Sequence, residues 1–311
     1  MKISINSLLL SVILCALGGQ LGHAQTVVFS DTFNTAGNAN DYGWYYRGTN
    51  QLTGSNTVTG GNMLLSNNGT AMGGSSAVWK SFNSTTLASG QTLRLTLNVS
   101  GYTAFSDGVF GPSIVLGNSS TAVSADGGYI VSSDLPRYAY RISLPRGATT
   151  GGTGGTGDGA TGITQMYTMN GTTPSNASQQ LSTNLFSANA AADANNQTLA
   201  VTSTAQTFFT LGTYTQDAVL VWDISNVGGQ ITFGGSFTAP NGGATTTFLS
   251  ADAGLVDNVT FNKIAIGNLL WGGTSFKVNS VDLQVVPEPT TWALIAAGMT
   301  FITVMRRRRL R

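Results

Sequence analysis

Charged residues are scarce in this chain of 311 residues, because Asp, Glu, Lys and Arg make up only 9% of it. An average globular protein has about 25% charged residues, so this fold does not depend on salt bridges. Residues 25–286 contain eight cations and twelve Asp, a net charge of −4. A chain with few cations and an acidic balance is a poor match for nucleic acid, which we therefore do not expect as a partner.

Cysteine, histidine and glutamate are almost absent, since Cys15, His23 and Glu288 are the single examples of each. Without residues 1–24 the chain has no thiol for a disulfide or a nucleophile, and no His for a catalytic triad or zinc. Glycosidases use paired carboxylates, but the body has no Glu and no Asp-x-Asp. We predict a protein that is not an enzyme and has no metal or cofactor.

The first 24 residues have the pattern of a signal peptide. Lys2 precedes an apolar run over residues 8–17, and the segment ends in the small residue Ala24. This order predicts export and cleavage by signal peptidase after Ala24. A lipoprotein signal is the weaker alternative, because Cys15 lies within the apolar run and follows Leu14 instead of a small residue.

Residues 285–311 form three consecutive parts. The proline-rich motif is followed by a mostly apolar, uncharged stretch over 290–305 and an arginine cluster over 306–311. A helix over 290–305 is about 24 Å long, so it crosses a ~30 Å hydrocarbon core only if flanking side chains snorkel. The arginines favour a cytoplasmic C-terminus. The residues are Pro287, Glu288 and Pro289 in the motif, and Arg306, Arg307, Arg308, Arg309 and Arg311 as the membrane stop.

This arrangement resembles the PEP-CTERM sorting signal of bacterial exported proteins. The resemblance implies that an exosortase, a membrane cysteine protease-transpeptidase, cuts near the motif and that the product reaches the cell surface or an exopolysaccharide matrix. The two prolines disfavour a helix, so we expect an extended handle for the protease at 287–289. A permanent single-span anchor is the alternative.

The body, residues 25–284, has short alternating or β-branched runs separated by Gly, Asn, Asp and Ser, without a sustained helical period. This pattern predicts one all-β domain, a single antiparallel jelly-roll sandwich. The turn residues 226–229 predict a tight hairpin. The expected strands lie at 26–29, 77–82, 92–99, 113–116, 138–144, 207–211, 218–224, 230–237, 245–249, 259–266 and 276–285.

A low-complexity strip of mostly Gly and Thr occupies residues 148–162. Such a composition buries too little apolar surface to offset its ordering entropy. We interpret it as a long loop between strands of one sandwich, because neither half of the chain has a self-contained set of strands. A linker between two domains is the alternative.

Parts of the body resemble concanavalin A-like lectin/glucanase sandwiches. The segments that carry the resemblance are 29–33, Trp44, 256–259 and 278–285. It implies that the first and last strands lie side by side and complete the jelly roll. Asp31 could then approach Asp257 or Asp282, which leaves calcium as an alternative to a simple turn-forming role for these Asp.

Sugar-binding candidates lie in two aromatic segments. In the strand expected at 138–144, alternation places Tyr138 on one face and Arg137 and Arg141 on the other. These arginines form a local positive patch that an anionic polysaccharide could use, although a buried Tyr face and a solvated Arg face is the simpler interpretation. Trp44 is a second candidate for stacking on a sugar ring, with a place in the core as its alternative.

We therefore predict an exported, non-catalytic cell-surface or exopolysaccharide-matrix protein with a C-terminal transmembrane helix. Signal peptidase and an exosortase are its expected processing partners, and an extracellular polysaccharide is its candidate ligand. A carbohydrate-binding, lectin-like module is the first alternative function. A polysaccharide lyase, working through Tyr and Arg, is the second.

Overall fold

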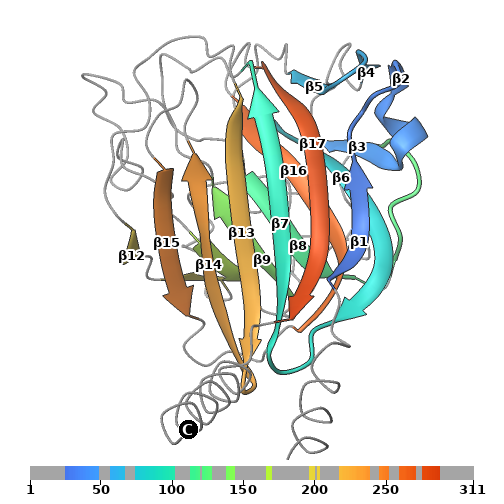
Figure 1. Ribbon diagram of the computed structural model, residues 1–311. Coiled ribbons are helices and arrows are strands. Elements are labelled where there is room, and N and C mark those ends of the chain that lie inside the picture. Colours follow the sequence, from blue (N-terminus) through green and yellow to red (C-terminus); the bar gives the residue numbers. More distant parts are fainter. Residues whose placement is uncertain are drawn as a thin grey trace, which may run out of the picture.

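A computed structural model describes residues 25–48, 57–66, 74–101, 113–119, 121–127, 138–143, 166–169, 196–199, 202–203, 217–238, 245–251, 259–270 and 275–287. The strands pair antiparallel in two sheets that face each other (Figure 1). The all-β sandwich predicted from the sequence is thus confirmed. Several predicted features lie outside the described residues: the segments 1–24, 148–162, 207–211 and 290–311, and the residues Arg137, Asp257, Glu288 and Pro289.

The larger sheet has the strand order β12-β15-β14-β13-β7-β17-β5-β4-β2, and β1 also pairs with β17. The last strand of the chain therefore lies inside this sheet, next to strands from the N-terminal part. The bounds are β1 (Thr26–Asp31), β2 (Gly37–Asn38), β4 (Thr57–Val58), β5 (Met63–Ser66), β7 (Gln91–Ser100), β12 (Thr202–Ser203), β13 (Ala218–Val227), β14 (Gln230–Thr238), β15 (Thr245–Ala251) and β17 (Ser275–Pro287).

The smaller sheet has the strand order β11-β10-β9-β8-β16-β6-β3. Both sheets combine strands from before and after residues 148–162. The bounds are β3 (Trp44–Gly48), β6 (Gly74–Thr86), β8 (Ser113–Asn118), β9 (Tyr138–Ser143), β10 (Met166–Met169), β11 (Asn196–Leu199) and β16 (Thr260–Leu270). A 3₁₀ turn, η1 (Ala39–Tyr42), precedes β3. Within the described part of the chain no helix is long and apolar enough to cross a membrane.

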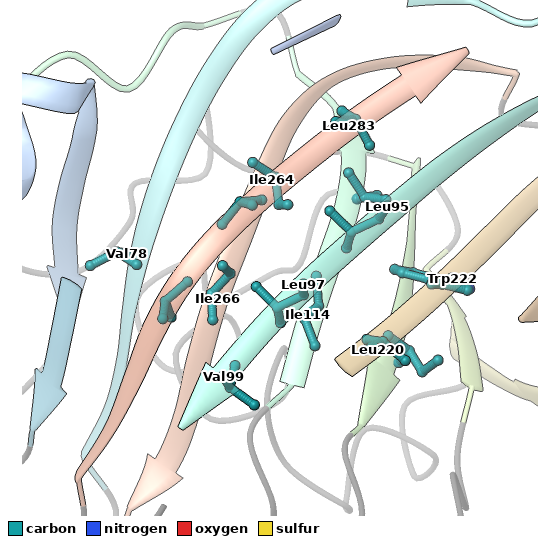
Figure 2. Close-up of a cluster of buried hydrophobic side chains, with 14 of the residues drawn as sticks. Val78, Leu95, Leu97, Val99, Ile114, Leu220, Trp222, Ile264, Ile266 and Leu283 are labelled. Carbon is teal, nitrogen blue, oxygen red and sulfur yellow. The ribbon is translucent and has the colours of Figure 1, made fainter. Parts of the chain in front are cut away.

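The core lies between the two sheets and follows from strand alternation. Every second residue of β7 and β13 is buried, and these apolar side chains meet those of β8, β16 and β6 from the other sheet (Figure 2). Burial of one such side chain contributes about 1.5–3 kcal/mol. The residues at the centre include Leu95, Leu97, Leu220, Trp222, Ile114, Ile264, Ile266 and Leu283.

The hairpin predicted at residues 226–229 is confirmed between β13 and β14. Val227 pairs with Gln230, so the turn consists of Gly228 and Gly229, with φ of 63° and 93°. Glycine adopts positive φ without steric cost, and two such residues match the twist of a two-residue hairpin. The Asn226 side chain fixes the turn, since its Oδ1 accepts the Gly229 N–H at 3.0 Å.

We predict that Leu97→Ala lowers the free energy of unfolding by about 2–5 kcal/mol, because the cavity forms where β7 crosses the smaller sheet. Urea denaturation measures this loss. Thr96→Ala is the matched control, since Thr96 lies on the opposite face of β7 and is half-buried, and it should change stability by about 0.5 kcal/mol or less. Equal losses in the two variants would contradict the assigned faces of β7.

Candidate functional site

The last strand leads directly into the Pro-Glu-Pro motif. Pro287 is the final residue of β17, where it pairs with Gln91, the first residue of β7. Val286 pairs with Thr92 in the same ladder. Proline removes a hydrogen-bond donor, so the end of a strand is a position that tolerates it. The described strand thus reaches the residue before Glu288, with no linker between sandwich and motif.

The first strand begins beside the end of the last one. Thr26 of β1 pairs with Val285 of β17. Both ends of the described body therefore lie at the same end of the sandwich, the lower end in Figure 1. The side-by-side arrangement expected for the first and last strands is confirmed.

A largely buried ion pair joins the two sheets near the other end of β1. Lys80 Nζ lies 2.9 Å from Asp31 Oδ2, and their side chains are 14% and 12% exposed. The indole N–H of Trp44 donates to the same oxygen at 2.7 Å. Lys80 also lies 5.1 Å from the centre of the Phe29 ring. Lys80 thus neutralises the carboxylate of Asp31. The cluster is a structural clamp that links β1 to β6.

The register does not bring Asp31 and Asp282 together. Asp31 pairs with Val281, and Asp282 pairs with Ser30. Because side chains alternate along a strand, Asp31 faces Lys80 in the interior while Asp282 lies on the opposite face of the larger sheet. A calcium ion shared by these two carboxylates is therefore excluded by this geometry. Among the residues that the structure describes, no group of three or more His, Cys, Asp or Glu could hold a metal.

Trp44 is a core residue, which agrees with the core interpretation and not with the sugar-stacking candidate. Its side chain is fully buried in the core and contacts the Phe29 ring edge-on, with centroids 6.2 Å apart. A ring without exposed area offers no face to a ligand. A place in the core was the alternative interpretation of the sequence, since a Trp near the start of a sandwich often fills its core.

Tyr138 and Arg141 lie in β9, where they pair with Asn118 and Val115 of β8. Tyr140, in the same strand, is buried and packs against Phe233 with ring centroids 4.7 Å apart. One face of β9 is therefore part of the core. The role of Tyr138, Arg141 and Arg137 in sugar binding stays a prediction.

The register reveals a row of residues that sequence reasoning missed. Across the face of the smaller sheet that points away from the core, Arg141 pairs with Val115, Val115 with Ala265, Ala265 with Trp79, and Trp79 with Tyr45. Val115, Ala265 and Trp79 are all buried. The Nε1 atom of Trp79 has no hydrogen-bond partner among the described residues. Alternation in 77–82 could have placed Trp79 on this face, but only the pairing shows its neighbours.

Arg94 and Asp223 form a two-bond ion pair on the outer face of the larger sheet, with N–O distances of 2.8 Å. The hydrogen bond to Asp223 is the largest cause that raises the pKa of Arg94; burial opposes it, and the attraction of the Asp223 charge adds a smaller upward effect. The Arg94 side chain is 43% exposed, so solvent screens the pair and its contribution to stability is modest.

Comparison with known families identifies the C-terminal segment. The model of the PEP-CTERM protein-sorting motif matches residues 285–309, so the match begins inside β17. The chain therefore carries the sorting signal of a bacterial protein that is exported across the inner membrane and processed by an exosortase. Its destination is the cell surface or the extracellular space. Comparison with curated protein sequences gives no match.

Among solved structures the chain is similar to two legume lectins and a phage enzyme. Peanut lectin with a 9mer peptide is 10% identical, with a TM-score of 0.44 and coverage of 85% of this chain and 98% of the lectin. For the metal-free lectin I-B4 from Griffonia simplicifolia the values are 9%, 0.43, 83% and 99%. For a carbohydrate esterase of the Shiga toxin-encoding bacteriophage phi24B they are 11%, 0.40, 84% and 99%. At these values the similarities assign no function to the chain.

We predict that Asp31→Ala lowers the free energy of unfolding by about 3 kcal/mol, because it leaves Lys80 buried without its carboxylate. Chemical denaturation at neutral pH measures the loss. Asp223→Ala is the control, since it breaks an ion pair with a half-exposed Arg94 and should cost about 1 kcal/mol or less. A larger loss from Asp223→Ala than from Asp31→Ala would contradict the structural role of the buried pair.

Proposed function

We propose that the chain is a non-catalytic β-sandwich that an exosortase releases from a transient C-terminal membrane anchor and that then serves at the cell surface or in an exopolysaccharide matrix. The observation that carries this proposal is the end of β17 at Pro287, paired with Gln91. The sorting motif thus begins where the sandwich ends, and a protease that cuts there removes no described strand.

The sheet restricts where a productive cut can fall. A cut before Pro287 would remove residues of β17 that pair with β7, namely Val285 with Leu93 and Val286 with Thr92. Those pairs lie inside the sheet, where an extended segment must leave its partners before a protease can bind it. A cut at or after the peptide bond between Pro287 and Glu288 needs no such opening. We therefore expect the mature C-terminus at Pro287 or a few residues beyond it.

The proposal also accounts for the chemistry of the body. Four charged side chains in the described part of the body form two ion pairs. Asp31 pairs with Lys80 in the clamp, and Asp223 pairs with Arg94. Neither arrangement leaves a nucleophile beside a base, as covalent catalysis requires. A stable, weakly charged sandwich suits a structural or adhesive role outside the cell.

The test is the intact mass of the protein purified from its native host, for wild type, Glu288→Ala and Thr291→Ala. Wild type and Thr291→Ala should end between Pro287 and the first residues of the predicted helix, and should leave the membrane fraction. Glu288→Ala should keep Arg311 and stay in the membrane, because the only carboxylate of the motif is lost.

Two results would contradict the proposal. A wild-type protein that keeps its arginines would be a permanently anchored envelope protein. A C-terminus well before Pro287, inside β17, would show that the sheet does not restrict the cut.

Carbohydrate binding is the second candidate function, favoured by the register of the smaller sheet, which pairs Arg141 of β9 with Tyr167 of β10. Arginine with aromatic residues is a common combination in sites for anionic sugars, because it supplies charged hydrogen bonds beside stacking surfaces. Trp79 is fully buried and offers no face to a ligand, so the candidate contact is the cross-strand pair of Arg141 and Tyr167.

We predict that Arg141→Ala weakens binding of an anionic polysaccharide such as alginate by roughly tenfold or more, the effect of losing one charged hydrogen bond. Arg94→Ala is the matched control, because Arg94 lies on the outer face of the other sheet and pairs with Asp223. Retention on a polysaccharide column measures the effect. Equal retention of both variants and wild type would contradict sugar binding through Arg141 and leave the structural role as the remaining function. Unsaturated products that absorb in the ultraviolet would identify a lyase.

A further inference from the structure

The end of the sandwich from which both chain ends emerge is free of charged side chains in four described segments. These segments, here called the terminal pole, are 25–28, 87–91, 226–230 and 283–287. They meet in the register, because Gln91 pairs with both Pro287 and Asn226, and Thr26 pairs with Val285. None of the four contains Asp, Glu, Lys, Arg or His.

The terminal pole also carries the exposed apolar residues. Among the described residues, Val27 and Val227 are the large hydrophobic side chains that are exposed, at 56% and 48%. Val227 lies at the tip of the β13–β14 hairpin, and Val27 lies beside Gln284 at the start of β1. A single exposed valine is ordinary, but both of these lie at the same end of the molecule.

The opposite end of the same strands differs in its charge. Lys277 lies near the start of β17 and Asp217 immediately before β13, and both are exposed. Asp217 accepts a hydrogen bond from the Asn279 side chain at 2.8 Å. The ion pair of Arg94 with Asp223 lies closer, in the cross-strand row of Gln284 at the inner border of the terminal pole. The four segments beyond that border carry no charged side chain.

The length of chain between the sandwich and the apolar segment is very short. Pro287 ends β17, and the uncharged stretch begins at residue 290. Three extended residues span at most about 10 Å. The headgroup layer on each side of a bilayer is about 5–8 Å thick. When residues 290–305 are in the membrane, the terminal pole must therefore touch the headgroups or lie within a few ångströms of them.

We propose that the terminal pole is a lipid-contacting surface that lies against the bilayer in the anchored precursor, with Val27 and Val227 at headgroup level on either side of the sorting motif. This inference rests on the proposed function, because it concerns the precursor before the exosortase cuts. Neutral turn groups cost less than full charges to move into the headgroup layer, which still holds water for them, and exposed valines gain by leaving water. The sandwich thereby holds Glu288 at the membrane surface, where a membrane-embedded protease can reach it.

The experiment uses residues 25–311, the precursor expected after signal-peptide cleavage, which contains no cysteine, reconstituted in vesicles of phosphatidylethanolamine and phosphatidylglycerol. Single cysteines replace Val227, Val27 or Lys277 and carry an environment-sensitive fluorophore. The expected result is a blue-shifted emission, quenched by headgroup-labelled lipid, at positions 227 and 27. Position 277, at the far end of β17, should report water and show no quenching. Truncation after Pro287 should abolish the shift at 227 and 27.

The outcomes separate this inference from the function on which it rests. A chain that floats with the vesicles but reports water at 27 and 227 overturns the lipid-contacting surface and leaves the anchored precursor intact. A chain that does not float with the vesicles overturns the anchored precursor and the surface together. Equal quenching at 227 and 277 also contradicts the proposal, because it means that the sandwich has no preferred orientation on the membrane.

Discussion

The antiparallel pairing of β17 with β7 is the constraint on which the rest of this structure depends. It places the last strand of the chain inside the larger sheet, with β13 on the far side of β7 and β1 on the far side of β17. The inward side chains of this pair, Leu95 and Leu97 against Leu283 and Val281, supply the centre of the core. Because the partners are far apart in sequence, the sandwich is complete only after residue 287 has been made.

That pairing also connects the fold with its processing. An extended strand that ends at Pro287 delivers the sorting motif at a defined place, and the pairing of Thr26 with Val285 brings the start of the body to the same place. The sorting signal at residues 285–309 and the predicted signal peptide before Gln25 both direct the chain to a membrane. Because both ends of the sandwich lie at the terminal pole, both segments can reach one membrane without a linker. The charged clamp of Asp31 and Lys80 lies at the other end of β1, away from that pole.

The sequence predicted what depends on local patterns, and it failed where partners are distant. Alternation in 92–99 and 218–224 located β7 and β13, and Gly228 with Gly229 located their turn, because these signals are local. It missed the short strands, which are held by backbone pairing to neighbouring strands: β2, β3, β4, β5, β10, β11 and β12. The sequence left both a core place and a sugar site open for Trp44, because an aromatic cluster has the same composition in each. Only the bond to Asp31 and the burial distinguish them.

The most direct test of the central claim is amide hydrogen exchange of the mature protein along β17 and β7. The account predicts that the amides of residues 281–286 exchange as slowly as those of 92–97, since the two segments protect each other as far as the sorting motif. Exchange at 283–286 as fast as in an unstructured peptide would contradict it. The last strand would then end before the motif, and a flexible linker would separate the sandwich from its sorting signal.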